Sequence, residues 1–179
     1  TIVFGSEGDL WTVDVRGGLA RSLTSHSGIE AYPAVSPDGQ TLAFSAQYEG
    51  PTEVYTMPLA GGQPTRRTFA GQGGTVAGWT PDGKILYATQ KYSTLPNTQL
   101  VVLDPANNTE SLLPLGQAAD GSFDASGRTI YFTRLPFQGS YTKRYRGGTA
   151  QNLWSYALGA AEAAPPPQPP KIVVSASNW

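Results

Sequence analysis

The densest group of side chains able to do chemistry lies between Leu135 and Gln151. Three cations alternate there with two tyrosines, in the order Tyr141, Lys143, Arg144, Tyr145 and Arg146. An arginine forms two parallel hydrogen bonds with a carboxylate, and a tyrosine adds apolar area and a hydroxyl group. These residues therefore predict contact with a ligand. The alternative is that the cations are solvated or hold neighbouring elements together.

The remaining reactive side chains form no catalytic or metal-binding pattern. His26 is the single histidine, and the chain has no cysteine. A hydrolase triad through His26 lacks the Gly-x-Ser-x-Gly motif, and zinc needs three or four ligands. Asp38 and Asp82 follow prolines in tight turns, where aspartate caps the turn. We therefore predict no catalytic residues, no metal site and no cofactor.

Charge and hydropathy limit the partners of the chain. The net charge is -1 and the isoelectric point is about 5.7, so we expect no basic surface for nucleic acid. The sequence has no run of eighteen apolar residues, so we expect no membrane span. We expect a cytoplasmic protein. The alternative is a periplasmic or secreted protein whose signal has been removed.

A repeat with an offset of 44 residues organises the chain. Val35–Gly39 recurs as Trp79–Gly83 and, in a degraded form, as Phe123–Gly127. Proline, aspartate and glycine at these positions favour a tight reversal of the chain. A β-forming run follows each copy: Thr41–Ser45, Ile85–Thr89 and Thr129–Thr133.

Each repeat has the pattern of four short strands joined by turns, without helical periodicity. Four strands in about 40–45 residues are typical of a β-propeller blade. We therefore predict an all-β fold, a partial β-propeller of about three and a half to four four-stranded antiparallel blades, in residues 1–158. An Ala/Pro-rich linker over residues 159–170 and a candidate extra strand over residues 171–179 are expected after it.

Both ends of the array lack a strand, because the first unit has no first strand and the fourth has no last one. Blades bury their faces against neighbouring blades, and soluble monomers avoid open apolar faces. We therefore expect a dimer, a blade patched by residues 171–175, or further blades from a longer chain. The core between blades is expected to contain Leu42, Phe44, Val54, Tyr55, Trp79, Leu86, Tyr87, Ile130, Phe132 and Trp154.

The antiparallel order of strands places the long loops on one face of the array. Loops after the second and fourth strands of each unit share this face, and the short turns share the opposite face. Binding residues usually lie on loops that a rigid scaffold holds. We therefore expect the cations and tyrosines of residues 135–151 on the face with the long loops.

Two segments resemble a known family. Tyr32–Phe44 is similar to the TolB-type propeller repeat, and Gly8–Val13 fits the same pattern. Lys143–Trp154 resembles a segment in the N-terminal six-bladed propeller of tricorn-type proteases, where a similar Tyr-Arg-Gly-Gly-Thr stretch leads into a strand. The resemblance covers roughly residues 1–158. It implies a large serine protease whose propellers guide peptides to and from a separate catalytic region, and it transfers no catalytic residue to this chain.

Two functions follow from these observations. The first is a non-catalytic propeller region that binds or guides peptide in a tricorn-like serine protease. The second is a free-standing TolB-like module that binds a partner protein. A propeller hydrolase or lactonase is a third class, but it needs a metal cluster in the central channel, and the acids here lie mostly in turns.

Overall fold

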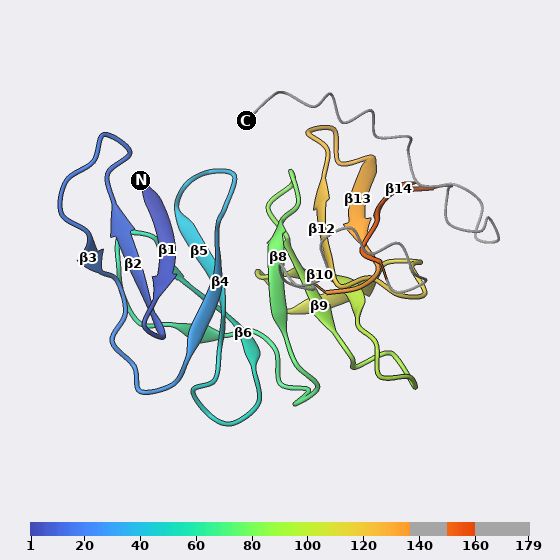
Figure 1. The fold of residues 1–179 in the computed structure, drawn as a ribbon, viewed down its shortest axis with the longest axis horizontal. Coiled ribbons are helices and arrows are strands. Elements are labelled where there is room, and N and C mark those ends of the chain that lie inside the picture. The colour runs from blue at the N-terminus through green and yellow to red at the C-terminus, as the bar shows by residue number, and fades with distance from the viewer. Residues whose placement is uncertain (137–149, 160–179) are drawn as a thin grey trace.

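The computed structural model describes residues 1–136 and 150–159, which form fourteen β-strands in four antiparallel sheets. Each sheet is a blade whose strands pair in chain order, as Figure 1 shows. The first blade contains β1 (Ile2–Ser6), β2 (Asp9–Val13) and β3 (Arg21–Ser22). The second contains β4 (Glu30–Val35), β5 (Thr41–Ala46), β6 (Glu53–Pro58) and β7 (Thr65–Arg66).

The third blade contains β8 (Thr75–Trp79), β9 (Ile85–Thr89), β10 (Gln99–Asp104) and β11 (Thr109–Leu112). The fourth contains β12 (Asp120–Phe123), β13 (Thr129–Thr133) and β14 (Leu153–Ala157). The predicted all-β propeller fold is confirmed, with four strands in the two middle blades and three described strands in each outer blade. The linker and the extra strand predicted over residues 159–179 lie, apart from Gly159, outside the described residues.

In the second, third and fourth blades, the turn before the second strand is held by a hydroxyl–carboxylate pair. Ser36 Oγ donates to Asp38 Oδ1 over 2.5 Å, and Thr80 Oγ1 donates to Asp82 Oδ1 over 2.6 Å. In the degraded third copy the two residue types exchange places, and Ser126 Oγ donates to Asp124 Oδ2 over 2.8 Å. The copy that looks degraded in sequence therefore keeps the same interaction.

The core consists of three apolar clusters, one between each pair of successive blades. Eight of the ten predicted core residues are buried: Leu42, Phe44, Val54, Tyr55, Leu86, Tyr87, Ile130 and Phe132. Trp79 and Trp154 are only half-buried and pack at the margins of two clusters. Trp79 Nε1 also donates to the carbonyl oxygen of Ala34 in the second blade, over 2.8 Å.

The strands predicted after each turn are present, and the second strand of the third blade is displaced by one residue relative to the 44-residue offset of the turns. Val35 is paired with Leu42, whereas Trp79 is paired with Ile85, so Ile85 is the structural counterpart of Leu42. The third blade has one residue fewer between its turn and its second strand. Because side chains alternate along a strand, this slip would exchange the two faces of β9.

No helix in the described part of the chain is long and apolar enough to cross a membrane. The prediction of a cytoplasmic location is not tested by this finding and stays a prediction.

Candidate functional site

An inner pocket of about 510 Å³ lies where the innermost strands of the second and third blades meet the long loops. Residues 32–34 of β4 and 75–77 of β8 form one side of it. Loop residues 96–98, 117, 119 and 134–136 also line it. Loops that the sequence predicts on one face thus converge on one concavity, which we take as the candidate site.

Polar side chains surround an apolar floor in the inner pocket. Ala34, Val76, Ala77 and Ala88 supply small apolar surfaces, which leave the space open. The polar groups are the side-chain amides of Gln90, Asn97 and Gln117, the guanidinium of Arg134 and the carboxylate of Asp120. This set offers donors and acceptors for an amide backbone and one charge of each sign.

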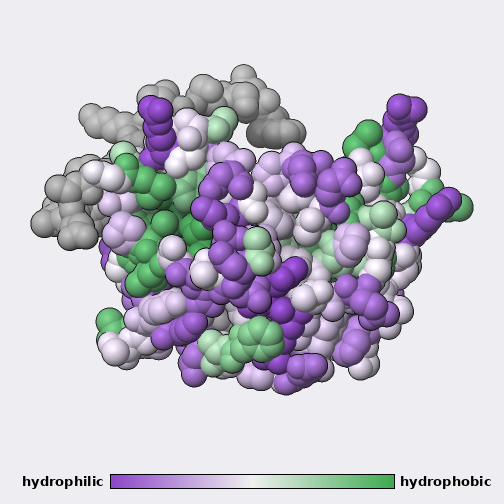
Figure 2. All heavy atoms as spheres, turned by 180° about the vertical axis from the view of Figure 1, so that it is seen from behind, coloured by the Kyte–Doolittle hydropathy of each residue, from purple (hydrophilic) through white to green (hydrophobic). Residues whose placement is uncertain are grey.

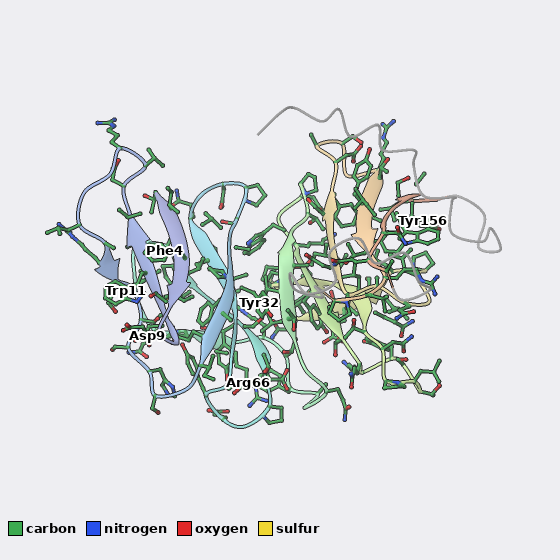
Figure 3. All side chains as sticks on the ribbon, viewed as in Figure 1. Phe4, Asp9, Trp11, Tyr32, Arg66 and Tyr156 are labelled. Atoms are coloured by element: carbon green, nitrogen blue, oxygen red, sulfur yellow. The ribbon has the colours of Figure 1, made fainter. Side chains whose placement is uncertain are left out.

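Tyr32 enters the inner pocket from an irregular part of β4, near the middle of the molecule in Figure 3. Its φ angle is +54°, although Pro33 follows it and disfavours such a conformation. The ladder between β4 and β5 is interrupted between Ala31 and Ala34, because proline cannot donate to it. The bulge leaves the Tyr32 side chain 59% exposed. Strain of this kind concentrates at binding sites.

Arg134 is the cation of the inner pocket, and neighbours position it. Its Nη2 donates to Gln117 Oε1 over 3.3 Å, and its guanidinium carbon lies 5.6 Å from the centre of the Trp154 ring. The side chain remains exposed, so it can still form a hydrogen bond with a ligand carboxylate. Sequence reasoning missed both Arg134 and Tyr32. For Tyr32, the available sequence signal was Pro33, because a proline inside a strand indicates a bulge that turns its neighbour outward.

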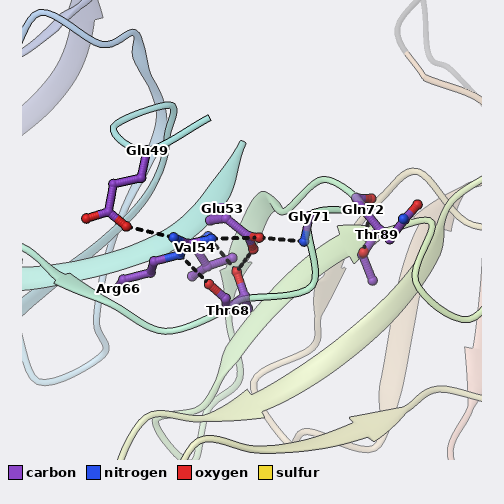
Figure 4. A network of polar contacts seen from close by, with 8 residues as sticks. All are labelled: Glu49, Glu53, Val54, Arg66, Thr68, Gly71, Gln72 and Thr89. Atoms are coloured by element: carbon purple, nitrogen blue, oxygen red, sulfur yellow. Dashed lines mark hydrogen bonds and ion pairs between the residues drawn. The ribbon is translucent and has the colours of Figure 1, made fainter. Parts of the chain in front are cut away.

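A buried network of polar contacts around Glu53, drawn in Figure 4, holds a loop that is hydrogen-bonded to one edge of the inner pocket. Glu53 is 1% exposed and accepts hydrogen bonds from Thr68 Oγ1, from the Gly71 amide over 2.7 Å and from Arg66 Nη2 over 3.2 Å. These contacts fix the loop after β7. The backbone N–H of Gln90 donates to the carbonyl oxygen of Gln72 in that loop over 3.1 Å. Gln90 is one of the residues that line the inner pocket.

The five residues predicted to bind a ligand, Tyr141, Lys143, Arg144, Tyr145 and Arg146, lie outside the described residues. The described start of their loop does reach the inner pocket, because Leu135 and Pro136 line it. Gln151 Nε2 donates to the carbonyl oxygen of Leu135 over 3.2 Å and links the two described ends of the loop. The binding role of the five residues stays a prediction.

His26 lies in a different place, an outer cleft of about 480 Å³ between the first and second blades. Its ring centre is 4.0 Å from that of Tyr48, and its Nδ1 accepts from the Gly28 amide over 2.9 Å. Glu30, also in this cleft, accepts from Tyr48 Oη and Thr24 Oγ1. These partners engage the Glu30 carboxylate and His26 Nδ1 within the fold.

Within the described residues, no group of three or more histidine, cysteine, aspartate or glutamate side chains is placed to hold a metal ion. The inner pocket contains no histidine among its lining residues. Its side chains are suited to hydrogen bonding and charge recognition. The predictions of no catalytic residue, metal or cofactor stay predictions.

Comparison with known proteins identifies relatives of much greater length. Tricorn protease homolog 1 of Streptomyces coelicolor is 32% identical over 157 residues, which are 86% of this chain but 14% of that protein. The tricorn protease of Thermoplasma acidophilum is 30% identical over 170 residues, 86% of this chain and 15% of that protein. A putative tricorn-like protease N-terminal subunit of Sulfurisphaera tokodaii is 28% identical and is covered over 83% of its length.

Solved structures show the same architecture. The crystal structure of the tricorn protease matches with a TM-score of 0.73 and 25% identity, over 86% of this chain and 16% of that one. TolB from Acinetobacter baumannii matches with a TM-score of 0.67 and 23% identity, over 83% of this chain and 35% of that one. Residues 1–173 match the family described as the tricorn protease N-terminal beta propeller domain. The chain therefore belongs to the family of tricorn protease N-terminal β-propeller domains.

Proposed function

We propose that this chain binds peptides in the inner pocket and, as part of a tricorn-like protease, guides them without catalysing their hydrolysis. The observation that carries the proposal is the composition of the pocket. Three side-chain amides and one charge of each sign surround a floor of small apolar residues. Amides pair with a peptide backbone, whereas Arg134 can bind a carboxylate.

The loop over residues 135–151 extends this proposal. Its first residues line the inner pocket, and its sequence adds three cations and two tyrosines. We propose that Tyr141, Lys143, Arg144, Tyr145 and Arg146 contact the same peptide, with the cations directed to its carboxylates. The relatives' names and the family match support the link to proteolysis, but this chain spans 14% of the length of the Streptomyces coelicolor homolog.

Binding of labelled peptides, measured by fluorescence anisotropy, tests the proposal. We expect Arg134→Ala to weaken binding of a peptide with a free carboxyl terminus about tenfold, because a charged hydrogen bond contributes about 1.5–3 kcal/mol. Arg21→Ala, on the exposed outer strand of the first blade, is the control and should bind like the parent. Equal affinities for all three proteins would contradict binding in the inner pocket.

A second variant separates the loop from the pocket. Arg144→Ala combined with Arg146→Ala should weaken binding of the same peptide, and amidation of the peptide's carboxyl terminus should remove the difference. An unchanged affinity for this double variant would exclude the loop while leaving the role of Arg134 intact.

The alternative function is that of a TolB-like module that binds a folded partner protein. The structural similarity to TolB favours it. In that case short peptides would neither bind the chain nor compete with the partner, whereas the peptide proposal requires direct binding. The two functions also differ in the compartment that we expect. A cytoplasmic location fits the peptide-guiding function, and a periplasmic location fits the TolB-like module.

A further inference from the structure

The first two blades carry the same buried hydrogen-bonded unit at the start of their third strands. In the second blade, Thr68 Oγ1 accepts from a backbone amide of β6 over 2.9 Å and donates to the carboxylate of Glu53. In the first blade, Thr24 Oγ1 accepts from a backbone amide of β2 over 2.9 Å and donates to the carboxylate of Glu30. Both glutamates are buried, with Glu53 1% and Glu30 3% exposed.

The two units differ in how the charge of the carboxylate is balanced. Glu53 has a cation beside it, because Arg66 Nη2 lies 3.2 Å from its Oε1. Glu30 accepts instead from neutral donors, the Tyr48 hydroxyl and, over 3.3 Å, the Leu10 amide. Among the described residues, no lysine, arginine or histidine side chain lies within ion-pair distance of Glu30. Buried carboxylates are usually paired with a cation, so the charge of Glu30 is available to a cation from outside the chain.

Glu30 lines the outer cleft together with three aromatic side chains. The ring centre of Tyr48 lies 4.0 Å from that of His26 and 4.7 Å from that of Tyr55. Aromatic faces attract cations and cover the apolar stem of a long basic side chain. Figure 2 shows hydrophobic side chains toward both ends of the molecule, but exposed apolar surface alone does not identify what binds it. The outer cleft combines a concave shape with aromatic rings and a buried carboxylate, and this combination does.

The other charges at the outer cleft also favour a cation. Glu49 and Arg66 line the cleft, and the Glu49 side chain is 70% exposed. The guanidinium of Arg66 pairs with both Glu49 and the buried Glu53, as Figure 4 shows. Its charge is therefore more than balanced. With Glu30 included, three carboxylates stand against one guanidinium.

The two loops that supply the aromatic rings are held against each other. His26 lies in the loop before β4 and Tyr48 in the loop after β5. The Gln47 amide donates to the carbonyl oxygen of Ile29 over 3.0 Å. A Cβ atom at Gly28 would lie 2.4 Å from the carbonyl oxygen of Gln47, so only glycine fits this contact. A site built in advance loses less conformational entropy when a ligand binds.

We propose that the outer cleft binds a basic side chain of a peptide, with its charge directed to Glu30 and Glu49 and its stem against His26 and Tyr48. Arginine suits the cleft better than lysine, because a planar guanidinium stacks on aromatic rings. The outer cleft and the inner pocket share no lining residue. The inference therefore does not depend on peptide binding in the inner pocket and adds a preference for basic residues.

A pair of labelled peptides tests the proposal by fluorescence anisotropy with the pure chain. One peptide carries a single arginine among alanines, and the other carries citrulline, which has nearly the same shape without the charge. Both are amidated, so they lack the carboxylate that Arg134 would bind. We expect the citrulline peptide to bind about tenfold more weakly, because a hydrogen bond to a charged group is lost. Equal affinities of the two peptides would overturn the proposal.

Glu30→Gln should weaken binding of the arginine peptide about tenfold. The amide keeps the size of the side chain, and the hydroxyls of Thr24 and Tyr48 can turn to accept from it. Glu110→Gln, in β11 of the third blade, removes the same charge outside the cleft and is the control. Arg134→Ala should also leave this affinity unchanged. Loss of binding in Arg134→Ala but not in Glu30→Gln would place the peptide in the inner pocket and overturn the inference. The opposite pattern supports the outer cleft even if Arg134 proves irrelevant to peptides with a free carboxyl terminus.

Nuclear magnetic resonance keeps the test decisive even if Glu30→Gln does not fold. His26 is the only histidine of the chain and lines the outer cleft, so its ring Cε1–H gives a single imidazole signal from the site. N-acetylarginine amide, titrated into the parent, should shift this signal, and N-acetylcitrulline amide should not. The same response to both compounds, or no response to either, would show that the outer cleft does not recognise a guanidinium.

Discussion

Arg66 forms ion pairs with two glutamates, one exposed and one buried. Comparing the two ion pairs shows how burial changes the strength of such a contact. Arg66 Nη1 lies 2.8 Å from Glu49, whose side chain is 70% exposed, and its Nη2 lies 3.2 Å from Glu53, whose side chain is 1% exposed. Solvent screens the first contact. The second belongs to a buried network, so removal of its charge takes the negative partner of Arg66 out of a site that solvent does not screen and weakens the hydrogen bonds that Glu53 accepts from Thr68 and Gly71.

We therefore expect Glu53→Gln to lower the free energy of unfolding by about 3 kcal/mol and Glu49→Gln by at most about 1 kcal/mol. Urea denaturation of the two variants and the parent measures both values. Both substitutions remove a carboxylate that pairs with Arg66, but Glu53 also accepts from Thr68 and Gly71, so the difference between the two losses reports the buried network around Glu53. Equal losses would mean that the network around Glu53 does not hold the loop after β7.

The turn aspartates predict how stability depends on pH. Hydrogen bonds from Ser36 and then the Gln40 amide hold the pKa of Asp38 below its ordinary value, and bonds from Thr80 and Lys84 lower the pKa of Asp82. A carboxyl whose pKa is lower in the folded chain stabilises it above the unfolded pKa of about 4. That contribution is lost as the pH falls through the folded values.

Urea midpoints at pH 6 and pH 3 test this dependence. The parent should lose stability on acidification, and the double variant with Asp38→Asn and Asp82→Asn should lose less, because asparagine keeps the turn bonds without titrating. Both carboxylates are exposed, so the expected difference is small. An identical drop in the midpoint of the two proteins would show that other groups control the acid response.

At the scale of elements, β13 shows how alternation divides one strand between core and surface. Phe132 is 2% exposed on the side facing the third blade, and the adjacent Tyr131 is 44% exposed on the other side. We expect Phe132→Ala to cost about 3–5 kcal/mol and Tyr131→Ala less than about 1 kcal/mol. Urea unfolding at low protein concentration, where association does not contribute, measures both. Similar costs would place β13 in the wrong register.

The sequence predicted the strands and blades well, because the turn residues and β-branched runs act locally. The 44-residue offset of the turns does not continue into β9, where Ile85 rather than Leu86 is the structural counterpart of Leu42. The loss of one residue between the turn and Ile85 is hard to detect in the sequence repeat. It nevertheless reverses which side chains of β9 face the second blade. Only the pairing of Trp79 with Ile85 reveals it.

The candidate site was less predictable than the fold. The sequence correctly indicated which loops share a face, because strand direction alone determines this. It did not indicate Arg134, which lines the inner pocket together with Gln117 and Tyr32, since their proximity depends on how three blades pack. Residues that are far apart in the chain and have no common motif give no local signal of such a pocket.

At the scale of the whole molecule, we expect the isolated chain to have no peptidase activity. A serine or cysteine hydrolase needs a base beside its nucleophile, yet the chain has one histidine and no cysteine. That histidine, His26, packs against Tyr48 in the outer cleft with its ring tilted by 45°, and its Nδ1 accepts from the Gly28 amide. The inner pocket, where we propose that peptides bind, is lined by other residues. Fluorogenic peptides incubated with pure chain should therefore remain uncleaved, and a His26→Ala variant should behave identically. Cleavage by the parent that His26→Ala abolishes would establish a catalytic site in the outer cleft and refute a purely guiding role.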